Sequence, residues 1–148
     1  MPINCVCRAT IKASPADCFT ALADTRGWAD WVRDLDRMDV LDPGEAGRPA
    51  RVRASATLGG YEHQVVLDVV ADPDAGSLTL DLVEGAGLEA IRGALGFSPV
   101  AGGALMAADI RITLAKNRPA RIERMLSRRI ETALTRDFVR HVARQRRG

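Results

Sequence analysis

The stretch that decides the fold is residues 119–146, which read PARIERMLSRRIETALTRDFVRHVARQR. Apolar side chains recur in it every three or four positions, which places them on one face of a helix. They are Ile122, Met125, Leu126, Ile130, Ala133, Leu134, Phe138 and Val142. The opposite face is rich in arginine, with Arg121, Arg124, Arg128, Arg136, Arg140 and Arg144. This pattern predicts one long amphipathic helix whose apolar face must be buried against another element of the fold.

Upstream of this helix, apolar and polar residues alternate, a period of two that is typical of half-buried strands. About seven such stretches lie at residues 3–12, 35–41, 48–57, 61–71, 78–82, 89–98 and 106–112. Turn sequences separate several of them, as at Asp72–Gly76 and Gly102–Gly103. Closely spaced strands with short turns predict an antiparallel sheet.

Two short helices are expected between the first strand and the second. Ser14 can cap a helix that has Pro15 at its first position and Asp17 in its first turn. A second helix is predicted to place Trp28 and Trp31 on one face, because they are three residues apart. The resulting order is strand, two helices, six strands and long helix, which predicts an α+β fold.

This order of elements, together with several short motifs, resembles the START-like (SRPBCC) superfamily in its polyketide cyclase/dehydrase branch. The matching residues are Ala13–Phe19 followed by Leu22–Asp24, Trp28–Trp31, Glu84–Gly85, Gly93–Pro99 and Gly102–Gly103. The resemblance implies a helix-grip (Bet v-type) fold, in which a curved antiparallel sheet wraps around the long C-terminal helix. A length of 148 residues suits one such ligand-binding domain over residues 1–148.

One stretch of the chain departs from that branch. Leu95 stands where the branch commonly has a tryptophan, and Ala94 and Gly96 flank it where longer residues are usual. These small side chains in the middle of the sheet predict either a wider cavity or closer packing of the helix.

A helix-grip fold encloses a pocket between sheet and helix, so residues that face inward are the expected contacts of an apolar ligand. From the strand phases and the resemblance together, these are Trp28, Trp31, Tyr61, His63, Ile91, Leu95, Phe97, Met106, Ala108 and Ile130. Aromatic residues make up only 4% of the chain, which draws attention to the two tryptophans. Two interpretations of them stay open, pocket lining and packing within the core.

His63 and Tyr61 are the candidate catalytic residues. They share one face of a strand, where His63 could act as a general base and Tyr61 as a hydroxyl donor in an aldol cyclisation or dehydration. The alternative is that His63 is a hydrogen-bonded structural residue. His141, at the edge of the polar face of the last helix, is expected to be solvated.

The sequence predicts no cofactor and no metal. HExxH, CxxC, GxSxG, GxGxxG and P-loop motifs are absent, and Cys5, Cys7 and Cys18 have no histidine close in sequence. The cysteines are interpreted as buried, reduced thiols of a cytoplasmic protein. No stretch approaches the roughly 18 apolar residues that span a bilayer.

The charges are unevenly distributed. The chain has 21 Lys/Arg and 19 Asp/Glu, but the segment from Lys116 onward is strongly basic. It is either the solvent face of a helix or a docking surface for nucleic acid, the ribosome or anionic lipid. Arg92 and Arg111 fall on the outward phase of their strands and are expected to form cross-strand surface pairs with acids such as Asp81 or Asp109.

Two classes of function follow from the resemblance. The chain is expected to bind a hydrophobic small molecule, such as a polyketide, lipid or quinone-like compound, either as a carrier or as a polyketide cyclase/aromatase-like enzyme. The further alternative is a ribosome-associating protein that uses its basic helix. Both a monomer and a homodimer are compatible with the sequence.

Overall fold

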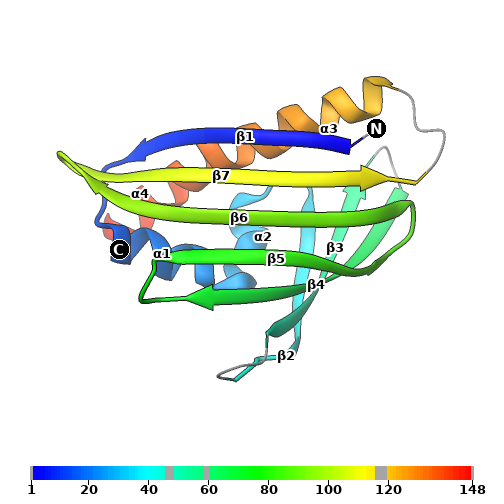
Figure 1. Ribbon diagram of the computed structural model, residues 1–148, viewed down its shortest axis with the longest axis horizontal. Coiled ribbons are helices and arrows are strands. Elements are labelled where there is room, and N and C mark those ends of the chain that lie inside the picture. The colour runs from blue at the N-terminus through cyan, green and yellow to red at the C-terminus, as the bar shows by residue number, and fades with distance from the viewer. Residues whose placement is uncertain (1, 46–48, 59–60, 116–119, 148) are drawn as a thin grey trace.

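The computed structural model describes residues 2–45, 49–58, 61–115 and 120–147 (Figure 1). Within these ranges, seven antiparallel strands form one sheet in the order β1-β7-β6-β5-β4-β3-β2. The strands are β1 (Pro2–Ile11), β2 (Leu35–Asp42), β3 (Ala50–Leu58), β4 (Tyr61–Asp72), β5 (Ser77–Gly85), β6 (Leu88–Val100) and β7 (Gly103–Leu114). The antiparallel sheet and the order of elements predicted from the sequence are therefore confirmed.

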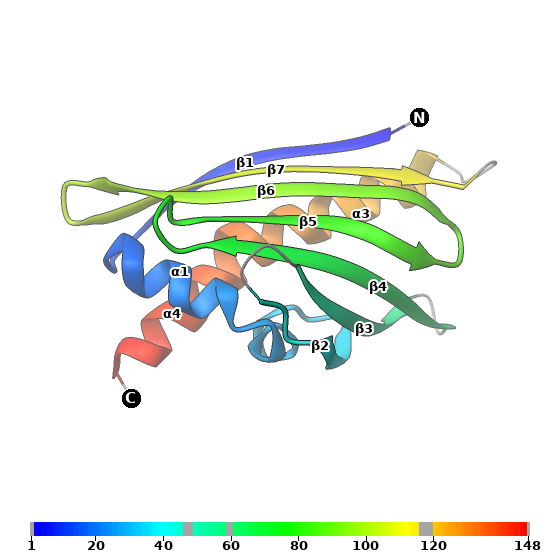
Figure 2. The same ribbon diagram turned by 60° about the horizontal axis from the view of Figure 1, so that its bottom comes forward.

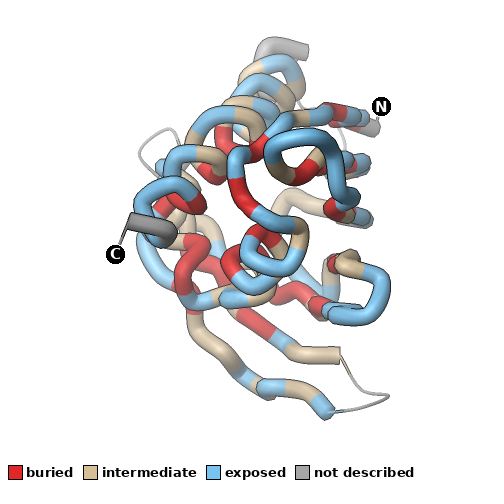
Figure 3. Tube along the Cα trace, turned by 90° about the vertical axis from the view of Figure 1, so that its left-hand side faces the viewer, coloured by how far each residue is buried: buried red, intermediate tan, exposed pale blue. Residues whose placement is uncertain are grey.

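The helices lie on the concave face of the curled sheet, and the C-terminal helix runs across that face (Figures 1 and 2). Between β1 and β2 the chain forms α1 (Pro15–Ala23), a 3-10 turn η1 (Thr25–Gly27) and α2 (Trp28–Trp31). Buried residues gather between the helices and the sheet (Figure 3). This arrangement is the helix-grip architecture, because one long helix covers the apolar face that the curved sheet presents.

Helix α1 begins where the sequence predicted it. The Ser14 side-chain oxygen accepts a hydrogen bond from the Asp17 backbone N–H at 3.1 Å, and Pro15 occupies the first helical position. This cap satisfies one of the free N–H groups at the helix start. Helix α1 is thereby held in position against β5, β6 and β7, which it contacts.

The C-terminal helix contains a π-helical turn. It consists of α3 (Ala120–Thr132), the π segment η2 (Ala133–Asp137) and α4 (Phe138–Arg147). Its apolar residues include a series spaced by four residues, namely Leu126, Ile130, Leu134, Phe138 and Val142. An α-helix has about 3.6 residues per turn, so such a series drifts by roughly 40° per step. The wider π turn takes up one extra residue and returns the series toward the sheet.

No helix within the described ranges is both long enough and apolar enough to cross a membrane.

The outer face of the sheet carries ion pairs at several positions. Arg92 lies 3.5 Å from Asp81 on the neighbouring strand, and Arg111 lies 3.8 Å from Asp109 on its own strand. Both arginines face outward as expected. The cross-strand pair is confirmed for Arg92, whereas it was wrong for Arg111, whose partner lies two residues away on the same strand. Both pairs are exposed, so each contributes little to stability.

The three cysteines are buried thiols, as expected. Cys5 and Cys7 lie on the same side of β1, and burial, with Cys5 close by, raises the pKa of the Cys7 thiol to about 11. Because the thiolate is the reactive form, these thiols are packing residues rather than nucleophiles.

His141 is buried, and the expectation that it is solvated was wrong. Its residue is 7% exposed, and its ring centroid lies 6.5 Å from that of Trp31. The reason is tertiary: α1 and α2 both contact α4, and the Trp31 ring of α2 lies beside His141. Burial lowers the pKa of His141, with Arg144 acting in the same direction and the acids Asp30 and Asp24 opposing it.

The first prediction concerns the turn between β6 and β7. A Cβ atom on Gly103 would collide with the backbone carbonyl oxygen of Ile11, whereas one on Gly96 would meet nothing within 4 Å. Gly103→Ala should therefore lower the free energy of unfolding by about 1–3 kcal/mol, because backbone cannot move aside as a side chain can. Gly96→Ala is the matched control and should change it by less than about 0.5 kcal/mol. Chemical denaturation of both variants checks this, and equal stability would contradict the close approach of β1 and β7.

The second prediction concerns pH. Because the pKa of His141 is lower in the folded state, the unfolded state takes up a proton first as the pH falls below about 6.5. Stability is thus present above that pH and is lost as the pH falls toward the folded-state pKa, with a slope of at most about 1.4 kcal/mol per pH unit for one proton. His141→Leu should flatten this part of the profile, measured by urea denaturation between pH 7 and 5. An unchanged slope in the variant would assign the effect to the carboxylates.

Candidate functional site

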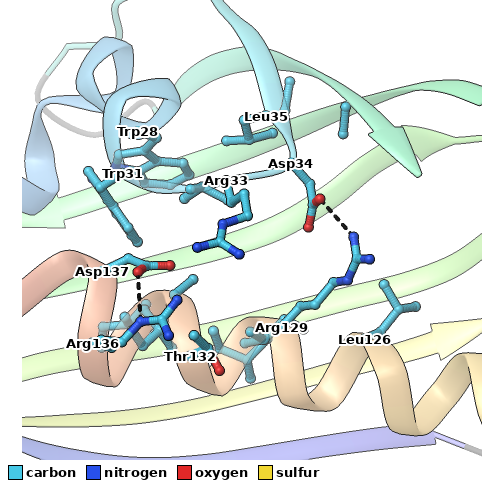
Figure 4. A pocket seen from close by; sticks show the side chains of 18 of the residues that line it. Trp28, Trp31, Arg33, Asp34, Leu35, Leu126, Arg129, Thr132, Arg136 and Asp137 are labelled. Atoms are coloured by element: carbon cyan, nitrogen blue, oxygen red, sulfur yellow. Dashed lines mark hydrogen bonds and ion pairs between the residues drawn. The ribbon is translucent and has the colours of Figure 1, made fainter. Parts of the chain in front are cut away.

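A cavity of about 600 Å³ lies between the sheet, helix α2 with the connection to β2, and the C-terminal helix (Figure 4). Its volume falls within the range of pockets that hold small organic ligands. Residues of the sheet and of the helices line it from opposite sides.

The floor is the set of residues from strands β3 to β7 that line the cavity, and all of them are aliphatic. They are Ala54 and Ala56 of β3, Leu67 of β4, Leu80 of β5, Leu95 of β6 and Ile110 of β7. They come from five adjacent strands, and each points to the concave face because side chains alternate along a strand. The floor therefore offers an apolar surface with no side-chain hydrogen-bonding group.

The two alanines of β3 leave room that larger side chains would fill. The other proposed source of space, the small residues beside Leu95, does not contribute. Ala94 is exposed and Gly96 half-buried on the face of the sheet away from the helices. The expectation that these two positions affect the cavity or the helix packing was wrong, because they alternate with the inward Leu95.

The walls contain both tryptophans. The Trp28 indole N–H donates a 2.8 Å hydrogen bond to the backbone carbonyl of Leu22, which fixes that ring. The Trp31 ring packs edge-on against Phe138 with centroids 5.0 Å apart. Both rings also line the cavity. The sequence left open whether the tryptophans line the pocket or pack in the core. Both apply, since each tryptophan packs in the core and borders the cavity.

The C-terminal helix contributes the remaining wall, and this part of the helix includes its wide π turn. Leu126 and Ile130 of α3 line the cavity, followed by Ala133 and Leu134 of the π segment η2. π turns inside α-helices are frequent at functional sites. Here the turn directs both apolar side chains and the charged pair Arg136–Asp137 to the cavity.

The mouth is the charged rim formed by Arg33 and Asp34, which follow α2, and by Arg128, Arg129, Arg136 and Asp137 of the C-terminal helix. Asp34 accepts a 2.7 Å hydrogen bond from Arg129, which joins segments 95 residues apart in sequence (Figure 4). Arg136 lies 3.1 Å from Asp137. The ion pair from Asp34 to Arg129 connects the α2–β2 link to the helix at the opening.

The structure distributes the predicted ligand contacts among three environments. Trp28, Trp31, Leu95 and Ile130 line the cavity. Phe97, Met106 and Ala108 face inward but are packed in the core, and Ile91 is partly buried against it. His63 is half-buried on the inward phase of β4, opposite Ala56, and is not a lining residue. The side chain of Tyr61 lies outside the described part of the structure.

The residues that form the mouth of the cavity were not predicted as site residues from the sequence. Arg128 and Arg136 were assigned to a solvent face, and Arg33, Asp34 and Arg129 carried no pattern that marked them. One sequence feature pointed to this site, namely the short polar segment that follows the Trp28–Trp31 helix. Its partner on the C-terminal helix can be recognised only in the folded chain. Within the described ranges, no group of three or more His, Cys, Asp and Glu side chains could hold a metal ion.

Comparisons with known proteins agree on the architecture. An aromatase/cyclase from a Streptomyces species superposes with a TM-score of 0.85 at 15% sequence identity, covering 100% of this chain and 98% of that one. A START superfamily protein from Mycobacterium smegmatis gives 0.80 at 14% identity, with 97% and 98% coverage. A protein from Thermus thermophilus gives 0.80 at 15% identity, with 96% and 98% coverage. At such identities the likeness concerns the fold. No curated protein matches the sequence.

The family profile described as polyketide cyclase/dehydrase and lipid transport matches residues 6–143. That range includes the sheet, both tryptophans, the floor and the π turn. The chain therefore belongs to this family of the START-like (SRPBCC) superfamily.

Proposed function

We propose that this chain binds a hydrophobic small molecule in the cavity and acts as its carrier. The observation that supports the proposal best is the floor, where five neighbouring strands present only aliphatic side chains to a space of about 600 Å³. Burying apolar surface there is favourable by roughly 25 cal/mol per Å². The description of the family, which includes lipid transport, is consistent with this function.

The same floor bears on the choice between carrier and cyclase. A poly-β-keto chain carries carbonyl groups at alternating positions, and each one buried without a donor costs roughly 1–3 kcal/mol. The floor provides no side-chain donor to meet them. A ligand with a continuous apolar body fits this surface better, which favours a lipid-like molecule over a polyketone.

The third prediction tests whether the cavity takes up ligand. Leu95→Trp should fill the space above β6 and weaken binding of an apolar fluorescent probe by about tenfold or more, because the added ring occupies ligand volume. Val83→Trp is the control, since Val83 is exposed on the outer face and its replacement leaves the cavity empty. Fluorescence titration of both, with thermal unfolding as a check of folding, measures the effect. Normal binding by a folded Leu95→Trp protein would place the ligand elsewhere.

A second candidate function is a cyclase of polyketide-like substrates. It is favoured by the position of His63, whose cross-strand partner Ala56 belongs to the floor. Solved structures named as aromatase/cyclases share the fold. In this hypothesis His63 is the general base and Tyr61 the hydroxyl donor that move protons while the cavity holds the chain in a reactive shape.

The fourth prediction separates the two functions. If the chain catalyses cyclisation, His63→Ala should lower turnover of a poly-β-keto substrate mimic by about 100-fold while ligand affinity stays within about twofold. Product formation and probe binding are measured on the same preparations. Tyr61→Phe is the companion variant, since it removes only the hydroxyl group. Turnover by His63→Ala equal to that of the unaltered protein would remove His63 from the mechanism.

A further inference from the structure

The charges at the mouth are not balanced. Four arginines line it, but it holds only two carboxylates, Asp34 and Asp137. Each carboxylate is already paired, at 2.7 Å with Arg129 and at 3.1 Å with Arg136. This leaves Arg33 and Arg128 uncompensated, an excess of two positive charges (four minus two) at the opening.

Arg33 is the more informative of these two cations. It has no ion pair or hydrogen bond with any residue in the described ranges. Figure 4 shows its side chain pointing from the α2–β2 link toward the helix, between the ion pairs made by Asp34 and Asp137. Its guanidinium therefore stands over the opening with its five N–H donors unused.

The charged groups of the cavity are also confined to one end. Every charged lining residue belongs to the mouth, and Thr132 beside it supplies the one hydroxyl among the lining residues. The floor is aliphatic throughout. A ligand that satisfies both regions has an apolar body, which lies on the floor, and a polar end, which stays at the mouth.

The excess positive charge at the mouth determines which kind of polar group the ligand can place there. A cationic head group would face excess positive charge, and both carboxylates that could accept from it are engaged with arginine. An anionic head group would find a free guanidinium at Arg33 and two further arginines whose remaining N–H groups can share it. Arginine binds carboxylate and phosphate with particularly good geometry through its paired donors.

We propose that the ligand is an amphipathic anion, a molecule with an apolar body and one carboxylate or comparable acidic group, bound with that group at the mouth and contacted by Arg33. This inference rests on the proposed binding function and narrows it to a ligand class. It assigns Arg33 the role of selecting the charge of the ligand, while the floor selects its apolar part.

The experiment uses two probes that differ only in charge, cis-parinaric acid and its methyl ester, titrated by fluorescence at pH 7.5 or so. The acid should bind the unaltered protein more tightly than the ester. Arg33→Gln should weaken binding of the acid by about 5- to 10-fold and leave the ester within about twofold, since a charged hydrogen bond is lost at a partly solvated site. Raising the ionic strength should weaken binding of the acid alone.

Arg92→Gln is the matched control, because it removes the same charge from the exposed outer face of the sheet. It should leave the affinity for both probes unchanged. Thermal unfolding of each variant establishes that the proteins compared are folded.

The outcomes are distinct. If acid and ester bind the folded protein equally well, and Arg33→Gln changes neither, the charge selection is wrong and the cavity remains a binding site for apolar molecules. An equal loss in Arg33→Gln and Arg92→Gln would also overturn it, because net charge and not the mouth would then be responsible. If neither probe binds the unaltered protein, the proposed binding function itself fails.

Discussion

The fold depends on burying the concave face of one curled sheet beneath its helices. The seven strands present a wide apolar surface, and the long C-terminal helix runs across it while α1 packs against β5, β6 and β7 (Figure 1). The helix must keep its apolar residues pointed at the sheet over its full length. Its apolar series is spaced by four residues from Leu126 to Val142, and the π segment η2 reconciles that spacing with helical geometry. Residues of this turn line the cavity.

The cavity arises because helix and sheet diverge around small side chains. At one end, Phe138 stacks against Phe97 and meets Trp31 edge-on, which closes the core around large rings. Farther along, the sheet offers Ala54 and Ala56 opposite Leu126 and Ile130, and the space between them stays open. The same two layers thus form a packed core at one end and the cavity at the other.

Charge is organised differently on the two sides of the molecule. On the outer face, arginines and acids lie on neighbouring positions of the sheet and pair with each other, as Arg51 does with Asp68 at 2.9 Å. At the mouth of the cavity, pairing is incomplete, and Arg33 and Arg128 have no acidic partner there. The outer pairs neutralise each other on the solvent-facing side of the sheet. The unpaired arginines beside the apolar cavity can instead bind an acidic group of a ligand.

The sequence by itself determined the order of elements, the antiparallel sheet, the cap at Ser14 and the inward side of strand residues such as Leu95 and Met106. These features depend on local periodicity and capping, which are determined by residues close to one another in the sequence. Periodicity reports the side of a strand but not what lies opposite, so it could not separate Leu95, which borders the cavity, from Met106, which is packed in the core. Only the tertiary structure decided that His141 is buried, with the Trp31 ring beside it. It also decided that Asp34 meets Arg129, because both outcomes depend on segments that folding brings together from distant parts of the chain.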